Sequence, residues 1–372
     1  MSGPVVRGWC PGALRPMASG DGLVVRIRPR LARLSAPQLL GLAALADRLG
    51  DGGLELTSRA NLQMYGVAEG AHGDLLEGLS GLGLVDDDPA LEGRRNVLVS
   101  PLWQPGDLTE RLTRALYDTL PALPELPAKV GFAVDASGAP VLGADPADFR
   151  LELGQAGLIL RAEGVARGRP VTEGEAIPAL IDLARLFAQT RRPEQKRVRD
   201  WAPEALPAAW QVAEPLPAAP RPRPGAQGAF AAPFGRIAVG NLVSLMGASE
   251  AQAVRVTPWR MLLVEGNCPA THPGFVSDPT DPILTTAACR GAPFCPQGSV
   301  ETRDLARRLA PFAPDLHMSG CAKGCARSTP AALTVVGRDG TYDLVEQGCA
   351  SDTPALSGLT LPDLIALLES RT

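Results

Sequence analysis

The feature that most limits how this chain can fold is a group of four cysteines near its C-terminal end. They form two pairs, C-x5-C and C-x3-C, with 25 residues between them, and the members are Cys289, Cys295, Cys321 and Cys325. Four thiolates can hold a [4Fe-4S] cube, one on each iron, and the glycines and prolines beside them let the backbone approach the sulfides. Zinc is the main alternative, but zinc pairs more often read C-x2-C to C-x4-C. The spacing therefore favours an iron–sulfur cluster.

Composition excludes several broad classes of protein. With 45% hydrophobic and 20% charged residues the sequence is typical of a globular protein, and its net charge of -4 argues against nucleic-acid binding. No apolar run approaches the roughly 18 residues of a membrane span. Residues 1–13 lack the apolar stretch of a secretory signal. We therefore expect a cytoplasmic protein that binds neither nucleic acid nor membrane, with two or more packed units in its 372 residues.

Three further cysteines, Cys10, Cys268 and Cys349, lie outside the two pairs. An odd number of cysteines in a reducing compartment is a poor disulfide framework, which again favours metal ligation for the clustered four. A lone cysteine is more often a small buried hydrophobe than a reactive group. We assign no role to these three, although Cys10 lies in a loop rich in Pro and Gly.

The order of the expected elements suggests an internal repeat. Strand, helix and strand are predicted at 22–28, 35–49 and 54–67. The stretch 203–233 is rich in Pro and Ala and is predicted to be a linker. Beyond it, a helix-bearing segment and a strand at 237–247 and 253–266 repeat the first pattern, with Val256-Thr257 matching Leu56-Thr57. We therefore expect two related halves, one on each side of the linker.

Several short motifs accompany the cysteine pairs. They are Thr57-Ser58-Arg59-Ala60-Asn61-Leu62-Gln63, Arg95-Asn96-Val97 and Leu126-Pro127-Ala128-Lys129. Together with the cysteine spacing, these motifs resemble the sulfite and nitrite reductase superfamily, and the resemblance extends over most of the chain. In that superfamily a [4Fe-4S] cluster is coupled to a reduced tetrapyrrole, whose carboxylates are gripped at these positions. The resemblance implies a macrocycle site made of Arg59, Asn61, Gln63, Arg95, Asn96 and Lys129.

The residue types in these motifs suit such a ligand. A macrocycle derived from uroporphyrin is edged with acetates and propionates, so its pocket needs fixed cations and amide donors, and the planar fork of arginine fits a carboxylate best. Almost all basic residues of this chain are arginines. A single arginine is more often a solvated surface residue, but the motif context favours a binding role for Arg59 and Arg95.

The resemblance also implies a fold. We expect an α+β protein of two halves related by a pseudo-two-fold axis, each with a ferredoxin-like segment and a sulfite-reductase-type α/β segment. The expected boundaries are 14–85 and 90–200 in the first half, the Pro/Ala-rich linker at 203–233, and 234–285 and 286–372 in the second half. The last of these segments would be the half-domain that carries the iron–sulfur cluster.

Two departures from the reductases point to one branch of the superfamily. Sulfite reductases have a second anion-binding lysine two places after the position of Lys129, but this chain has Gly131 there. The charge that a small oxyanion substrate needs is therefore missing. Lys323 also replaces an asparagine inside the last cysteine pair. With segments 7–12, 19–23 and 319–326, these departures resemble the precorrin-3B synthase family.

In that family the macrocycle is the substrate, precorrin-3A, and no sirohaem is permanently bound. The resemblance implies an O2-dependent monooxygenase of aerobic cobalamin biosynthesis that hydroxylates C20 of precorrin-3A. The ring A acetate closes a γ-lactone to give precorrin-3B, and the cluster would deliver electrons. Two alternatives stay open, a sirohaem-dependent sulfite or nitrite reductase and a non-catalytic iron–sulfur protein.

Oxygen activation in the family is attributed to a mononuclear non-haem iron, for which the sequence suggests no ligand set. His72, His272 and His317 are the only histidines, and no two-His-one-carboxylate spacing is visible. His317 precedes Cys321 by four residues, which makes it a candidate proton donor or iron ligand. The commoner role for such a residue is a structural histidine.

Direct nicotinamide binding has no support in the sequence, because neither a G-x-G-x-x-G motif between a strand and a helix nor a P-loop is present. Electrons would then come from a separate reductase or ferredoxin that docks near the cluster, with NADH as the ultimate donor. We therefore expect the purified chain alone not to oxidise NADH.

Overall fold

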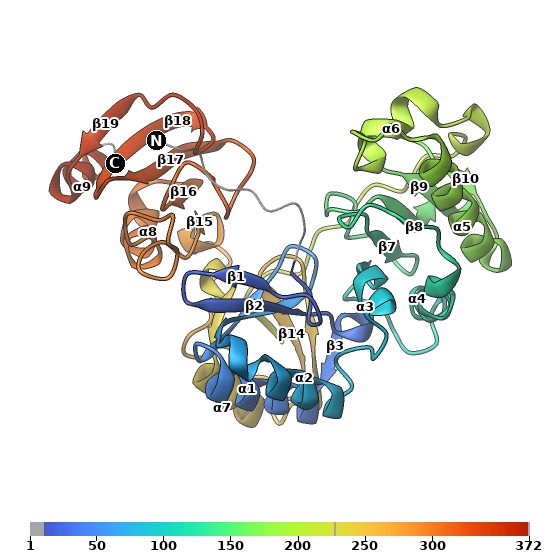
Figure 1. Ribbon diagram of the computed structural model, residues 1–372, viewed down its shortest axis with the longest axis horizontal. Helices are drawn as coiled ribbons and strands as arrows, with labels where there is room; N and C mark the ends of the chain where they lie inside the picture. Colours follow the sequence, from blue (N-terminus) through green and yellow to red (C-terminus); the bar gives the residue numbers. More distant parts are fainter. Residues whose placement is uncertain (1–10, 227, 371–372) are drawn as a thin grey trace.

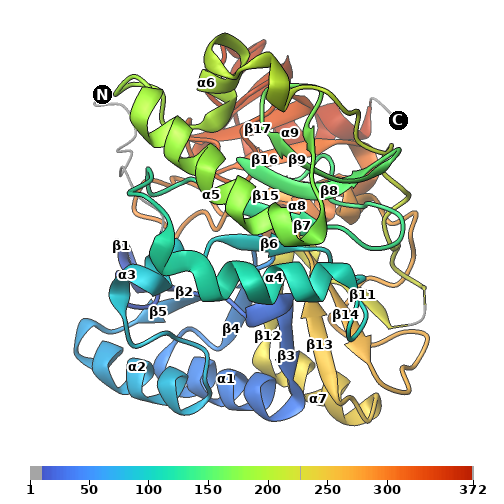
Figure 2. The same ribbon diagram turned by 90° about the vertical axis from the view of Figure 1, so that its right-hand side faces the viewer.

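The computed structural model describes residues 11–226 and 228–370, which form three lobes (Figure 1). A central lobe holds two β-sheets, and two α/β lobes adjoin it, one toward the left and one toward the right in Figure 1. We call residues 89–210 the N-terminal α/β lobe. Residues 282–370 carry the paired cysteines, and we call them the cysteine lobe. Figure 2 shows both α/β lobes on the same side of the central lobe, opposite helices α1 (Ala36–Leu49), α2 (His72–Gly81) and α7 (Val239–Ala248).

Two antiparallel sheets build the central lobe. The first has the order β1 (Met17–Ser19), β2 (Gly22–Ile27), β5 (Leu62–Val67), β4 (Gly53–Leu56), β12 (Arg236–Ala238). The second has the order β11 (Ala229–Ala231), β14 (Met261–Glu265), β13 (Ala253–Val256), β3 (Arg33–Ser35). Both sheets pack on one apolar core that includes Leu34, Leu54 and Val254.

Each sheet of the central lobe takes one strand from the other half of the chain. Strand β3 pairs with β13, with Leu34 opposite Val254, and β12 pairs with β4, with Ile237 opposite Leu54. The turns that lead into these two strands match, because Leu31 and Phe234 both adopt left-handed backbone angles, with φ of 56° and 55°. This reciprocal exchange relates the two halves by the expected pseudo-two-fold and joins them into one unit.

The two α/β lobes share one topology. Their sheets run β6 (Val97–Val99), β7 (Phe132–Asp135), β8 (Phe149–Gly154), β9 (Gly157–Ala162), β10 (Arg169–Pro170) and β15 (Ala287–Ala288), β16 (Leu316–Ser319), β17 (Ala331–Arg338), β18 (Thr341–Gly348), β19 (Leu356–Leu359). In each sheet the first three strands run parallel to one another. The fourth strand is antiparallel to the third, and the fifth is antiparallel to the fourth. The predicted α+β architecture of two related halves is confirmed.

Helices occupy corresponding places in the two α/β lobes. Helix α4 (Leu108–Thr119) joins β6 to β7 as α8 (Arg303–Leu309) joins β15 to β16, and α5 (Glu173–Thr190) and α9 (Leu361–Glu369) follow the last strands. The N-terminal α/β lobe adds α3 (Pro89–Arg94) and α6 (Val198–Ala205). No helix in the described part of the chain is both long and apolar enough to cross a membrane.

Most local predictions are confirmed, and two need correction. The Ser35 side chain caps the expected helix α1, and a capping box of Thr172 and Glu175 opens α5. The segment 54–67, predicted as one strand, is instead a hairpin, because Thr57 and Asn61 close a turn with a 2.9 Å backbone hydrogen bond. Ala60 takes a left-handed φ of 52° in that turn. The segment 253–266, also predicted as one strand, is likewise a hairpin, formed by β13 and β14. In both segments the turn coincides with a break in the apolar pattern, at 57–61 and at 257–260.

The Pro/Ala-rich stretch 203–233 is more structured than a simple linker. It begins inside α6 and ends with β11, which pairs with β14 of the second sheet. Between them the chain lies against the N-terminal α/β lobe, where Ala213 and Pro215 form isolated bridges to Gly168 and Gly154. The many prolines supply few backbone donors, so this segment follows the sheet without extending it.

Candidate functional site

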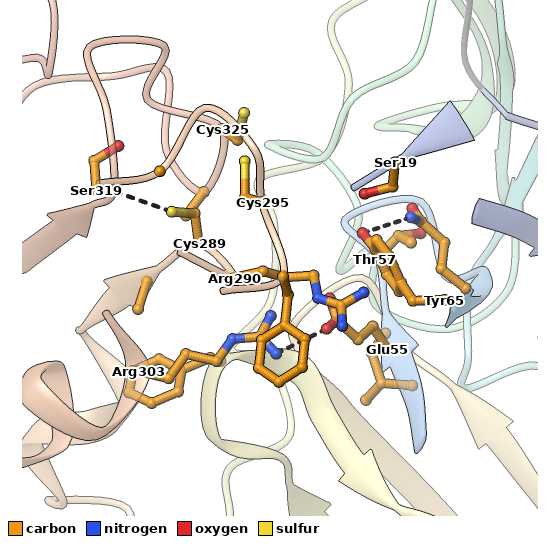
Figure 3. A pocket seen from close by; sticks show the side chains of 18 of the residues that line it. Ser19, Glu55, Thr57, Tyr65, Cys289, Arg290, Cys295, Arg303, Ser319 and Cys325 are labelled. Carbon is orange, nitrogen blue, oxygen red and sulfur yellow. Dashed lines mark hydrogen bonds and ion pairs between the residues drawn. The ribbon is translucent and has the colours of Figure 1, made fainter. Parts of the chain in front are cut away.

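The four paired cysteines meet at one end of the parallel strands of the cysteine lobe. Cys289 follows β15 directly, and Cys321 comes two residues after the end of β16. Because β15 and β16 are parallel neighbours, the loops after them leave the sheet at the same edge, where ligand sites of α/β sheets lie. Cys289, Cys295, Cys321 and Cys325 all line one pocket of about 340 Å³ between this edge and the central lobe (Figure 3).

Glycines allow the two cysteine loops to pack tightly against each other. A Cβ atom on Gly320 would lie 3.1 Å from Cα of Gly291 and 3.3 Å from Cα of Gly298. The backbone N–H of Gly320 donates to the Sγ atom of Cys289 at 3.2 Å. Backbone donors aimed at cysteine sulfur are the hydrogen bonds that adjust an iron–sulfur site. The glycines around the motif are therefore needed for close approach of the backbone.

The paired thiols lie near enough to affect one another. Burial raises the pKa of Cys321, and the neighbouring Cys289 and Cys295 raise it further, against the lowering effect of the Lys323 backbone and charge. Burial likewise raises the pKa of Cys325. Burial therefore disfavours the thiolate form of these cysteines. Metal ions bound by them would stabilise the thiolates, because cysteine binds metal in its deprotonated form.

The spread of the thiols also bears on the kind of metal site. Among the described residues, no three His, Cys, Asp or Glu side chains converge as ligands of a single ion would. In a cube each thiolate binds a different iron, so its four sulfurs need not meet at one point. The donor set of four cysteines on one pocket wall therefore fits an iron–sulfur cluster.

The opposite wall of the pocket is formed by β4, β5 and the turn between them, with Thr57, Ser58, Gln63 and Tyr65. Arg26 donates to Oε1 of Gln63 at 2.9 Å, and Nε2 of Gln63 donates to the Tyr65 hydroxyl at 2.9 Å. Burial raises the pKa of Tyr65, so the phenol stays protonated. The structure thus places Gln63 in the pocket, and its amide orients Tyr65.

Three pocket arginines were not predicted from the sequence. Arg290 pairs with Asp21 at 3.0 Å and Asp51 at 2.7 Å, and Arg303 pairs with Glu55 at 2.8 Å. Arg260 donates only to backbone carbonyls in the described structure. A signal for Arg260 existed, because the repeat that aligns Thr57 with Thr257 places this arginine on the equivalent turn.

Arg59, Asn96 and Lys129 come together where the N-terminal α/β lobe meets the central lobe. Arg59 donates to the carbonyl oxygen of Lys129 at 3.1 Å, and Nδ2 of Asn96 donates to the carbonyl oxygen of Val130 at 2.9 Å. The Lys129 side chain is exposed. Asn61 is buried at the end of the same turn and accepts from the backbone of Thr57.

Arg95 has a different place from the one that the motif implied. Its side chain is only 3% exposed and pairs with both Glu92 and Asp86, the latter at 2.9 Å. It also donates to the carbonyl oxygen of Arg28 at 2.7 Å, while Arg28 pairs with Glu92. Two carboxylates already pair with this guanidinium, and Arg95 is not among the residues that line the cysteine pocket, so its binding role stays a prediction.

Among the described residues, the three histidines do not combine with carboxylates into a possible metal site. His72 contacts the carbonyl oxygen of Ala13, and His272 contacts the hydroxyl of Ser244. His317 is fully buried in β16, and within the described structure neither ring nitrogen has a hydrogen-bond partner. Burial lowers the pKa of His317 to about 4, and Arg327 and Arg260 add to the effect.

Of the cysteines outside the two pairs, Cys268 and Cys349 lie outside the pocket lining. Cys268 and Cys349 contact the carbonyl oxygens of Val264 and Ser328, at 3.7 Å and 3.8 Å. Cys10 and most of the segment 7–12 lie outside the described residues. No role for these cysteines follows from the structure.

Comparison with known proteins defines the class. Residues 15–82 match the nitrite/sulfite reductase ferredoxin-like half domain. The fold is similar to that of the Mycobacterium tuberculosis NirA protein, with a TM-score of 0.62 and 18% identity over 94% of this chain and 81% of that one. A precorrin-3B synthase from Sinorhizobium sp is 31% identical over 398 residues, covering 94% of this chain and 84% of the relative. The chain therefore belongs to the precorrin-3B synthase family of enzymes, within the nitrite/sulfite reductase superfamily.

Proposed function

We propose that this protein is an O2-dependent precorrin-3B synthase that converts precorrin-3A to precorrin-3B in aerobic cobalamin biosynthesis. The pocket supports the proposal, because its lining combines four thiols with arginines and the amide of Gln63, in a chain of this family. One atom of O2 would be inserted at C20. The other would be reduced to water by two electrons and two protons. The ring A acetate would then form the γ-lactone.

We assign the cluster site to Cys289, Cys295, Cys321 and Cys325. A [4Fe-4S] cluster held by these thiolates supplies single electrons at the pocket. The chain itself contributes the N–H of Gly320, which supports Cys289, and the tight glycine contacts that hold both loops close together. A further mononuclear iron is not assigned to any residues.

The macrocycle would be bound by cations and amides on the central lobe. Gln63 and Tyr65 lie in the pocket, where Tyr65 accepts from Gln63 and so keeps its own hydroxyl proton for a ligand oxygen. Arg59 and Asn96 lie at the junction with the N-terminal α/β lobe, and both suit a carboxylate at the macrocycle edge. Fixed donors of this kind orient the substrate before reaction.

Two alternatives predict different chemistry. A sirohaem-dependent reductase needs a charged group for a small oxyanion, but Gly131 supplies none where the sulfite reductases have lysine. A non-catalytic iron–sulfur protein would not need the Gln63–Tyr65 pair. Both observations favour the synthase.

The electron donor is proposed to be a separate cytoplasmic protein, a reductase or ferredoxin that receives its electrons from NADH. No nicotinamide motif is present in the sequence. The purified chain should therefore leave NADH unoxidised until such a donor is added. Rapid oxidation of NADH by the chain alone would contradict this part of the proposal.

The first test is spectroscopic. Ultraviolet–visible and electron paramagnetic resonance spectra of the anaerobically purified protein, before and after dithionite, should show an iron–sulfur cluster and no sirohaem bands. Addition of precorrin-3A should perturb the cluster signal, and O2 with an electron donor should yield a product one oxygen atom heavier. Sirohaem bands would favour the reductase, and absence of iron would overturn the cluster assignment.

A further inference from the structure

Arg260 lies at the turn between β13 and β14 and reaches across to the cysteine lobe. Its Nη1 atom donates to the carbonyl oxygen of Thr286 at 3.1 Å, and its Nη2 atom contacts that of Ala326 at 3.4 Å. Ala326 directly follows Cys325. The guanidinium is therefore fixed on the wall of the pocket beside the second cysteine loop.

Arg260 forms no ion pair in the described part of the chain, and the carboxylate that acts on its charge, Glu55, is paired with Arg303. Its neighbours are all paired, Arg290 with Asp21 and Asp51, Arg303 with Glu55, and Arg327 with Asp315. For Arg260, no ion pair within 4.0 Å occurs among residues 11–226 and 228–370. Burial lowers the pKa of Arg260 and Arg303 lowers it further, while Glu55 opposes this, and an arginine remains charged at neutral pH.

A desolvated cation that forms no ion pair is costly. Guanidinium has five N–H donors, and the two carbonyls use two of them, so donors remain for a ligand. The backbone of Arg260 is also unusual, because its φ of 57° is left-handed in a residue that is not glycine. Its equivalent in the first half, Ala60, shares this conformation without the charge. Both halves therefore share this turn conformation, and only the second half has an arginine at this position.

We propose that Arg260 binds an anionic group of the ligand that occupies this pocket, namely a carboxylate of the tetrapyrrole. The identity of the ligand rests on the proposed function, whereas the anion site rests on the unpaired guanidinium. The other possible source of negative charge is the thiolate-ligated cluster. A carboxylate contact changes ligand affinity, and a cluster contact changes the reduction potential, so the two sources can be distinguished.

The test uses the full-length protein with its cluster and uroporphyrin as the carboxylate-edged probe. Arg260→Gln removes the charge and Arg260→Lys keeps it without the fork. Arg308→Gln, on the exposed side of α8 and outside the pocket lining, is the matched control for loss of one arginine. Dissociation constants are measured by quenching of porphyrin fluorescence, and cluster midpoint potentials by electron paramagnetic resonance in a redox titration.

We expect Arg260→Gln to weaken uroporphyrin binding about tenfold, as loss of one charge-assisted contact would. Arg260→Lys should weaken it severalfold, and Arg308→Gln should not change it. Unchanged affinity in Arg260→Gln would overturn the inference, and a shifted potential with that result would assign the cation to the cluster. If Arg260→Gln does not accumulate, wild-type affinity in Arg260→Lys would overturn it. A wild-type protein that binds no uroporphyrin would instead refute the proposed function, and the inference with it.

Discussion

The Asn96 side chain lies directly against Gly131: a Cβ atom at position 131 would be 2.6 Å from Nδ2 of Asn96. It would also be 3.1 Å from Nη1 of Arg59. Real Cβ atoms essentially never lie as close as 2.6 Å, so a side chain here must displace the Asn96 amide, while the Arg59 guanidinium must give by a few tenths of an ångström. The missing lysine of the sulfite reductases is thus more than a lost charge, because the small residue makes room for Arg59 and Asn96 to lie together.

Replacing Gly131 should therefore damage the proposed macrocycle site. In Gly131→Ala, the displaced amide of Asn96 loses its bond to Val130, and we expect uroporphyrin to bind severalfold more weakly. Stability should fall by only about 1 kcal/mol, since flexible side-chain ends can shift. Gly143→Ala, whose Cβ would meet only Ala218 at 3.5 Å, is the control. Gly131→Lys should not produce sulfite reduction without added haem, and if it did, our use of Gly131 against the reductase would be wrong.

Arg95 and Arg59 should differ in what their loss affects. Arg95→Met removes the cation that Glu92 and Asp86 share; Glu92 keeps Arg28 and Asp86 keeps Arg30, so the lost charge-assisted contacts should cost about 1.5–3 kcal/mol. Arg59→Met should change stability far less and instead weaken uroporphyrin binding. Urea denaturation and fluorescence titration of both variants compare these effects. A stable Arg95→Met protein with impaired binding would restore the role that the motif implied.

The cysteine assignment predicts a difference between paired and unpaired thiols. Cys321→Ser removes one of the four proposed ligands, so iron content and the visible absorbance of the cluster should fall severalfold. Cys349→Ser is the control, since Cys349 contacts Ser328 outside the pocket lining and should leave iron content unchanged. Iron analysis of anaerobically purified protein measures both. Equal iron in the two variants would exclude Cys321 as a ligand.

Structural features that depend on residues close together in the chain, such as helix caps and the cysteine loops, could be predicted from the sequence. The capping box of Thr172 and Glu175 depends on residues three apart, and the cysteine loops follow short strands at the spacing that the motif indicates. The internal repeat could also be found from the sequence, because Thr57 and Thr257 recur at equivalent positions. In the structure the hydroxyl oxygen of each threonine accepts from a backbone N–H within its turn. Such patterns need no knowledge of distant partners.

Features set by distant partners could not be predicted. The pairing of β3 with β13 brings Leu34 beside Val254, and no local pattern specifies which sheet a three-residue strand joins. The burial of Arg95 depends on Glu92 and Asp86 closing around it, so a motif alone could not show that its charge is neutralised. That Arg260 forms no ion pair in the described structure, because Glu55 pairs with Arg303, is likewise a property of tertiary packing.

His317 should make the protein less stable in mild acid. Its pKa is about 4 in the folded chain because of burial, against about 6.5 in an unfolded chain. Between these values the unfolded state binds more protons, so stability is complete above pH 6.5 and falls as the pH decreases. The expected loss from this residue is about 2 kcal/mol at pH 5 and about 3 kcal/mol at pH 4.

Replacement of His317 by leucine should remove this part of the pH dependence. Leucine cannot bind the proton, and the buried ring nitrogens have no described partners to leave unsatisfied. The free energy of unfolding, measured by urea denaturation at pH 8 and pH 5, should therefore fall less for His317→Leu than for the wild type. Comparing the two proteins cancels the other titrating groups, which they share. Equal losses in both would mean that His317 is protonated equally in the folded and unfolded states, contrary to the buried, neutral ring described here.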